Sequence, residues 1–239
     1  MAHREIKDQT YPQFARIGAA LSSERRLELI DLLAQAPRNV EALAQEAEMS
    51  VANTSQHLQA LKAAHLVETE RDGTRIVYRL AGEDVLALWL ALRATAEAQL
   101  PEVGEIVRNV GAANGSAGHV DRAELSDLVR AEDIVLLDVR PRLEFDHGHI
   151  PGALALPIEE LSDRLSELPT NKRFVVYCRG SYCQWADEAV ALLQRNGFDA
   201  ARVEGGWSEW AGEHRTKANG DSADVGHERD HGEIRRQVI

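Results

Sequence analysis

Apolar residues recur at helical spacing early in the chain, which predicts that the first hundred residues are mainly helical. Leu27, Ile30 and Leu33 form one apolar stripe. Ser23 precedes this stripe and is a residue type that caps helices, and Pro37 follows it, where a helix would end. The pattern therefore predicts a helix between Ser23 and Pro37.

Two shorter helices are predicted next. Asn39 is expected to cap a segment with Leu43 on its apolar side. Ser50 is expected to cap a further helix in which Leu58 and Leu61 face inward. Two helices joined by so short a turn predict a helix-turn-helix unit.

A hairpin and a long helix complete the first region. Residues 66–70 and 74–80 are rich in strand-forming residues and are separated by Arg71-Asp72-Gly73. An Asp-Gly pair between two such runs is typical of a β-hairpin. A long helix is predicted from Glu83 to Arg108.

The second half alternates strand and helix patterns. Residues 134–139 and 173–178 read as short buried strands, and residues 186–196 as an amphipathic helix. This alternation predicts an α/β domain with a mostly parallel sheet.

Composition places the boundaries between these parts. Residues 1–110 are expected to form a mainly α winged helix-turn-helix domain and residues 119–211 the α/β domain. The small, polar stretch 111–118 reads as a flexible linker. Residues 212–239 have little apolar periodicity and are expected to be disordered.

Charge and residue usage exclude several classes of protein. The chain has a net charge of −12, which argues against a large basic surface that coats DNA but not against a small basic DNA-binding surface. No apolar run approaches the roughly 18 residues that span a bilayer, so no membrane partner is expected. Two cysteines do not make a disulfide scaffold, and we expect the protein to act in the reducing cytoplasm.

The polar face of the third helix and the hairpin are candidates for contact with double-stranded operator DNA. A helix fits the major groove and a hairpin can reach phosphates, whereas a polar face alone would equally suit solvent. The expected DNA-binding residues are Ser50, Asn53, Thr54, Ser55, Gln56, His57, Gln59, Lys62, Arg71 and Arg75.

The segments SSERRLELIDLLA and MSVANTSQHLQALKAAHLVETERDGTRIVYRL make residues 10–108 resemble the ArsR/SmtB family of winged-helix repressors. The resemblance implies a homodimer that reads a palindromic operator, with residues 11–21 and 83–108 at the dimer interface. Many family members bind metals through cysteines before the recognition helix. The corresponding segment NVEALAQEAEM has neither Cys nor His, so no metal and no cofactor is expected in this domain.

Both cysteines lie in one loop between a predicted strand and a predicted helix: Cys178-Arg179-Gly180-Ser181-Tyr182-Cys183. Loop amides and a helix N-terminus can stabilise a thiolate, so Cys178 is expected to have a depressed pKa and to act as a nucleophile. A lone cysteine at a strand end would more often be a core residue. Phosphatases with a cysteine loop need an arginine six positions after the cysteine, and Gln184 occupies that position here.

Three segments in order, LLDVRPRLEFDHGHIPGALALP, VVYCRGSYC and VEGGWSEW, make residues 119–211 resemble the rhodanese family of sulfurtransferases. The resemblance implies that Cys178 attacks a sulfane sulfur, as in thiosulfate or a persulfide, and carries a persulfide that passes to an acceptor. It assigns the other residues of the loop, Arg179 to Cys183, to the catalytic site.

Four further residues match supporting positions of that resemblance. Asp138 and Arg140 are interpreted as structural, Glu144 lies near the active site, and His149 is expected to hold the loop before Pro151. Cys183 could resolve a persulfide on Cys178 or only pack beneath the loop, and the sequence leaves both open.

Two functions follow from this arrangement. The favoured one is a transcriptional regulator, a repressor, whose C-terminal domain senses or processes reactive sulfur at Cys178. The alternative is a sulfurtransferase tethered to DNA, with no signalling between the domains. The flexible linker slightly favours the alternative, whereas the absence of a sensor thiol in the first domain favours the regulator.

Overall fold

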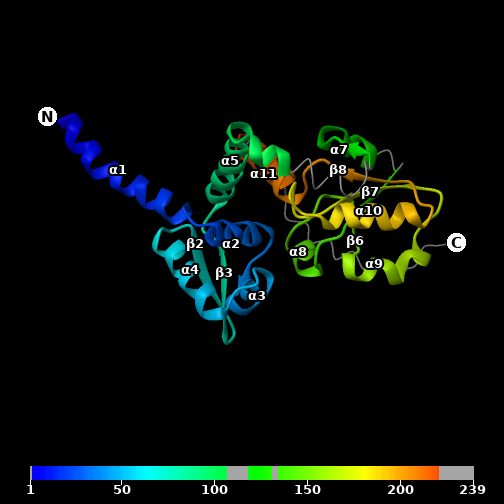
Figure 1. Cartoon of the computed structure of the whole chain (residues 1–239), viewed down its shortest axis with the longest axis horizontal. Coiled ribbons are helices and arrows are strands. Elements are labelled where there is room, and N and C mark those ends of the chain that lie inside the picture. Colours follow the sequence, from blue (N-terminus) through cyan, green and yellow to red (C-terminus); the bar gives the residue numbers. More distant parts are fainter. Residues whose placement is uncertain (1, 107–117, 131–133, 221–239) are drawn as a thin grey trace.

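The computed structural model describes residues 2–106, 118–130 and 134–220. Figure 1 shows a helical N-terminal domain beside an α/β C-terminal domain, with α1 (Ala2–Leu21) extending away from both. The predicted linker at residues 111–118 lies outside the described residues except for Gly118.

The N-terminal domain is a winged helix-turn-helix. Its helices are α2 (Glu24–Gln35), α3 (Val40–Glu46) and α4 (Val51–Ala63). The predicted caps of the last two are confirmed, because the side chain of Asn39 accepts from the Ala42 amide and that of Ser50 accepts from the Asn53 amide. Ser23 occupies the cap position of α2 without making a side-chain cap bond.

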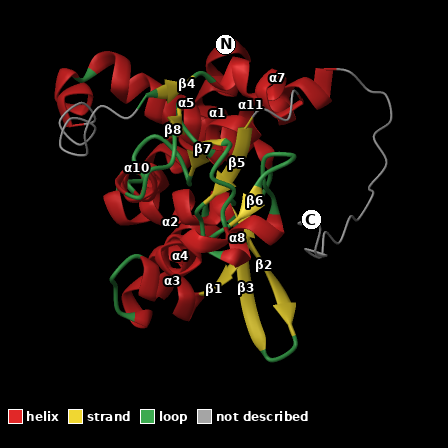
Figure 2. Cartoon of the chain, turned by 90° about the vertical axis from the view of Figure 1, so that its right-hand side faces the viewer, coloured by secondary structure: helices red, strands yellow, loops and turns green. Residues whose placement is uncertain are grey.

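The wing is the predicted antiparallel hairpin of β2 (Val67–Asp72) and β3 (Arg75–Leu80). A two-residue strand not expected from the sequence, β1 (Arg38–Asn39), pairs with the other side of β3. Figure 2 shows the hairpin projecting from the body of the domain. The core beneath it consists of apolar residues of α2, α3, α4 and the hairpin, among them Leu29, Leu43, Leu58 and Leu61.

The long helix predicted from Glu83 to Arg108 is interrupted. The first part, α5 (Glu83–Gln99), ends at Leu100, which is extended, and residues 101–106 form a separate helical segment. The cause is Pro101, because a residue before proline is sterically disfavoured in the helical region. Residues 107 and 108 lie outside the described part.

The C-terminal domain has a five-stranded parallel sheet in the order β4-β8-β7-β5-β6, as predicted in class. The strands are β4 (His119–Val120), β5 (Ile134–Asp138), β6 (Leu154–Ala155), β7 (Arg173–Tyr177) and β8 (Ala200–Val203). The intervening helical segments are α7 (Arg122–Arg130), α8 (Arg142–His147), α9 (Ile158–Arg164), η1 (Leu165–Glu167) and α10 (Trp185–Arg195). Two apolar clusters form its core, one containing Phe174 and Val190, the other Val175 and Trp207.

The last helix, α11 (Trp207–Gly220), runs through part of the segment expected to be disordered. Trp207, Trp210 and His214 stack in succession along it, and Arg122 pairs with Glu213 at 2.7 Å. Residues 212–220 are therefore helical, and residues 221–239 lie outside the described residues.

The two domains meet where α11 packs against α5 and α2. The approach is close at Gly212, where an added Cβ would collide with the side chain of Leu90. No helix within residues 2–106, 118–130 and 134–220 has the length and apolarity needed to cross a membrane.

Candidate functional site

The two cysteines bound a loop, residues 178–183, at the carboxyl end of the central strand β7. This cysteine loop is held from below by the segment that leads into α11. The Trp207 amide donates to the Cys178 carbonyl and the Ser208 amide to the Arg179 carbonyl, both at 3.0 Å. Gly206 lies so close that an added Cβ would collide with the Cys178 carbonyl oxygen and stand 2.7 Å from the Gly180 nitrogen. The loop conformation thus requires glycine at position 206.

The two thiols differ in burial. Cys178 is 0% exposed and belongs to the core beneath α10, whereas Cys183 is half-buried. The Cys178 thiol donates to the Cys183 carbonyl oxygen at 3.3 Å, and the contact between the two thiols shifts the pKa of both. Both cysteines are free thiols, and the two residues are in direct contact.

Their acidities move in opposite directions. Complete burial, together with the hydrogen bond to Cys183, raises the pKa of Cys178 well above its ordinary value. The same bond lowers the pKa of Cys183, assisted by the backbone N–H groups of Arg179 and Trp185 and by the charge of Arg179. The expectation of a depressed pKa at Cys178 is therefore wrong for this state, because burial outweighs the charge of Arg202 and the hydrogen bond from the Ala186 amide.

The side chain of Arg179 extends toward the N-terminal domain. Its Nε donates to Glu144 at 2.9 Å, its Nη2 pairs with Glu46 of α3 at 2.7 Å, and its guanidinium lies 4.4 Å over the ring of Trp185. Glu144 is fully buried and also pairs with Arg38 of β1. These four residues, Arg38, Glu144, Arg179 and Glu46, form an ion-pair chain that crosses between the domains twice.

Asp138 and Arg140 form a fully buried ion pair at the end of β5, in keeping with the structural role expected for them. The Nη2 of Arg140 lies 2.6 Å from Asp138 and 2.8 Å from the Gly148 carbonyl, which fixes the segment after α8. Its Nη1 lies 3.3 Å from the Oε1 of Gln35. The amide of Gln35 donates in turn to Ser208 at 2.7 Å, so α2 contacts the base of the cysteine loop.

His149 lies apart from the thiols. It is exposed, stacks on Phe145 at 3.8 Å, and has its Nδ1 3.0 Å from the Phe145 carbonyl oxygen. The ring packs on the turn of α8 that precedes its own loop, which agrees with a supporting role.

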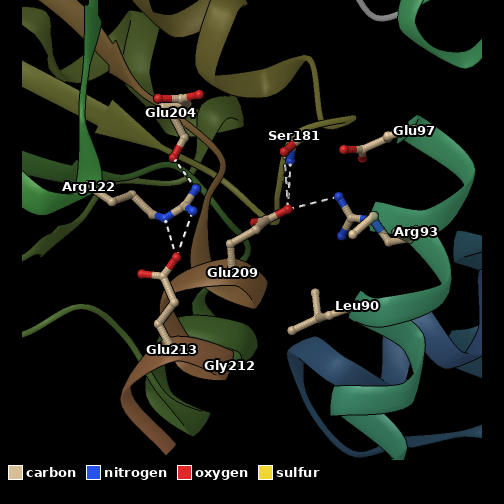
Figure 3. Close-up of a pocket in the computed structure, with 10 residues that line it drawn as sticks. Leu90, Arg93, Glu97, Arg122, Ser181, Glu204, Glu209, Gly212 and Glu213 are labelled. Atoms are coloured by element: carbon tan, nitrogen blue, oxygen red, sulfur yellow. Dashed lines mark hydrogen bonds and ion pairs between the residues drawn. The ribbon is translucent and has the colours of Figure 1, made fainter. Parts of the chain in front are cut away.

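A second set of contacts joins the far side of the cysteine loop to α5 (Figure 3). Arg93 pairs with Glu209 of α11 at 2.8 Å, and the same carboxylate oxygen accepts from the amide and hydroxyl of Ser181. Tyr182 donates to Glu97 and lies beneath Arg93, 4.5 Å from its guanidinium. Within the described part of the chain, the buried Arg93 Nε and Glu209 Oε2 have no hydrogen-bond partner. These contacts border a cavity of about 430 Å³, whose other wall carries Arg122 and Glu213.

A cavity of about 440 Å³ opens between the domains at Cys183. The C-terminal domain contributes Arg179, Gly180, Tyr182, Cys183, Gln184, Trp185 and Glu188 to its wall, and the N-terminal domain contributes Glu28, Asp31, Leu32, Glu46 and Arg93. Burial raises the pKa of Asp31, against the hydrogen bond from Trp89. Four carboxylates against two arginines make this cavity a negatively charged approach to the thiol.

The sequence did not indicate this junction. Gln35 and Arg38 were not expected to be functional, although Gln35 follows Leu32 at helical spacing and is a polar residue on an apolar stripe. This polar residue on an otherwise apolar helix face was the feature of the sequence that could have indicated a buried polar contact.

The candidate DNA surface lies on α4 and the wing. Asn53, Gln56, Gln59 and Lys62 are exposed, as are Ser50, Arg71 and Arg75, while Ser55 and His57 are half-buried. The expectation that Thr54 contacts DNA is wrong, because it is 0% exposed and its hydroxyl donates to the Ser50 carbonyl. Lys62 donates to Thr69 at 2.8 Å and thereby ties α4 to the wing.

Comparisons with known proteins agree with this division. Residues 121–213 match the rhodanese-like domain, and residues 23–69 match the arsR family of bacterial regulatory proteins. The HTH-type transcriptional regulator Rv0324 of Mycobacterium tuberculosis is 44% identical over 198 residues, which cover 83% of this chain and 87% of that protein.

Two relatives each match one part of the chain. A sulfurtransferase of Allochromatium vinosum is 35% identical over 94 residues, 38% of this chain and 86% of that protein. The solution structure of a homodimeric winged helix-turn-helix DNA-binding domain from Mycobacterium bovis, a possible ArsR-family transcriptional regulator, is 47% identical. It covers 39% of this chain and 87% of that one, with a TM-score of 0.38.

Proposed function

The chain belongs to the ArsR family of bacterial regulators and carries a C-terminal rhodanese-like domain, and we propose that it is a repressor whose affinity for operator DNA depends on sulfur bound in the cysteine loop. In this proposal a sulfane-sulfur donor, such as a persulfide, leaves a persulfide on Cys178. The protein would act in the cytoplasm, where thiols are kept reduced.

The observation that carries the proposal is the ion-pair chain. Arg179 directly follows Cys178 and pairs with Glu46, the last residue of α3, which precedes α4. Cys178 is 0% exposed in a packed core, so an added sulfur atom has to displace its surroundings. A displaced loop would move Arg179, and with it the contact to the helix-turn-helix.

A ligand shifts an equilibrium only through a difference in its affinity for two states. The docked state holds Arg179 between Glu144 and Glu46, and a sulfur-loaded loop would hold it less well. Operator affinity would then differ between reduced and loaded protein by the free energy of these contacts.

We further propose that the regulator is a homodimer. Ile6, Tyr11 and Phe14 of α1 are each more than half exposed on a helix that projects from the domain (Figure 1). Apolar side chains gathered on one projecting helix favour burial against a second copy. In such a dimer two copies of α4 would face successive turns of a palindromic site.

The test is operator binding by the full chain, using DNA from upstream of its own gene, before and after treatment with an organic persulfide. Mass spectrometry on the same samples locates the added sulfur. We expect loading to change affinity by more than tenfold, about 1.4 kcal/mol, and Cys178→Ser to abolish the change.

Glu46→Gln should also weaken the response, because it removes the partner of Arg179 in α3. The matched control is Glu41→Gln, an exposed carboxylate on the same helix. If Cys178 takes up sulfur and affinity is unchanged, the domains act separately and the protein is a DNA-tethered sulfurtransferase.

A further inference from the structure

A donor that enters between the domains meets Cys183 first. Cys183 lines the cavity of about 440 Å³, whereas Cys178 is absent from its wall and is 0% exposed. Direct attack by Cys178 would require the loop to open, because its sulfur lies in the core that packs against Ala186 and Val190.

Cys183 also has the surroundings of a nucleophile. The backbone N–H groups of Arg179 and of Trp185, the first residue of α10, lower the pKa of Cys183. The Cys178 thiol, whose sulfur lies 3.3 Å from the Cys183 carbonyl oxygen, also lowers the pKa of Cys183. Such donors favour the thiolate, which is the reactive form of cysteine.

We propose that Cys183 is the residue that takes sulfur from the donor, and that Cys178 is the inner site to which the sulfur then passes. The inference rests on the proposed function only in assuming that sulfur reaches the cysteine loop. It assigns a catalytic role to a residue that could otherwise only pack beneath the loop.

The first step is an attack of the Cys183 thiolate on the terminal sulfur of a persulfide, R–S–SH. A sulfur–sulfur bond forms to Cys183, the donor's sulfur–sulfur bond breaks, and its electron pair leaves with R–S⁻. The products are Cys183–S–SH and the thiolate R–S⁻, so the number of atoms and the charge are conserved.

The second step transfers that sulfur inward. Cys178–SH and Cys183–S–SH become Cys178–S–SH and Cys183–SH, with the proton of Cys178 passing to the Cys183 sulfur that it already contacts. Around Cys178, the Ala186 amide donates to the sulfur and the charge of Arg202 favours an anion. Arg202 reaches the loop itself, 3.2 Å from the Gly180 and Ser181 carbonyls.

The experiment is a single-turnover reaction of the full chain, in excess, with cysteamine persulfide. The released thiol is measured over time, and the added sulfur is located by peptide mass spectrometry. We expect Cys178→Ser still to release one equivalent of thiol, with the added sulfur retained on Cys183. Cys183→Ser should be slower by about a hundredfold.

The opposite pattern would overturn the inference. If Cys178→Ser is inactive while Cys183→Ser reacts at the wild-type rate, Cys178 attacks the donor directly and the proposed function still stands. If wild-type protein releases no thiol and gains no sulfur, the proposed function itself fails.

A second measurement needs no variant. Limited alkylation of the wild-type chain with iodoacetamide at neutral pH, followed by peptide mapping, reports which thiol reacts first. We expect Cys183 to be labelled before Cys178. Earlier labelling of Cys178 would contradict the assignment even if the variants fold poorly.

Discussion

Replacement of Arg38 by methionine tests whether the domains dock in solution as described. Arg38 is buried in β1, with a side chain 3% exposed, and pairs with Glu144, which is 0% exposed. Methionine retains much of the side-chain length but removes the charge. Glu144 is then left with Arg179 as its one cationic partner in the ion-pair chain.

The magnitude follows from burial. Breaking a buried pair by removing one partner costs about 3–5 kcal/mol. Because Glu144 keeps its contacts with Arg179 at 2.9 and 3.1 Å, we expect a smaller cost of about 2–3 kcal/mol, below that range.

Urea unfolding provides the assay, with the fluorescence of the four tryptophans as reporter; Trp185 contributes to it, and Arg179 stacks on its ring. At a slope of about 2–3 kcal/mol per molar urea, the midpoint should fall by about 1 M. The control is Arg25→Met, which removes an exposed pair with Glu28 at 3.0 Å and should shift the midpoint far less. Equal shifts for the two variants would refute the buried pairing.

Three further outcomes are expected. Gly206→Ala should slow thiol release about tenfold, because the new methyl group collides with the cysteine loop, and should leave the circular dichroism spectrum unchanged. A wild-type rate would contradict this close approach. Cys178→Ala should raise the pH midpoint of Cys183 alkylation, since the Cys178 thiol that lowers the pKa of Cys183 is lost. Cys178→Ser should raise the midpoint less, because a hydroxyl still donates; midpoints identical to wild type in both variants would exclude this effect. Thiosulfate, an anion, should load the protein about tenfold more slowly than cysteamine persulfide at low salt, because carboxylates such as Glu28 and Glu188 line the cavity. If the ratio of the two loading rates does not change with salt, this charge effect is excluded.

Much of each domain could be predicted from local patterns. The caps at Asn39 and Ser50 and the hairpin at Asp72-Gly73 depend on residues close together in the chain, and all are present. The end of α5 was not predicted, although Pro101 disfavours the helical conformation at Leu100. Residues close together in the chain therefore suffice to predict these helix ends and the hairpin.

The roles within the cysteine loop could not be predicted in the same way. Whether an amide converges on Cys178 or Cys183 depends on how the loop curls, and spacing does not determine that. The partners of Arg179 are also distant in the sequence, with Glu46 in another domain and Glu144 on helix α8. Long-range contacts of this kind are properties of the assembled chain.

The pairing of Arg179 with Glu46 implies an influence of DNA on sulfur chemistry as well as the reverse. Coupling between two binding equilibria is reciprocal, so if sulfur loading weakens operator binding, as a loosened Arg179 contact would, the operator disfavours sulfur loading by the same free energy. Protein seated on its operator would therefore resist loading more than free protein does. The occupied promoter would then set the concentration of donor at which the response begins.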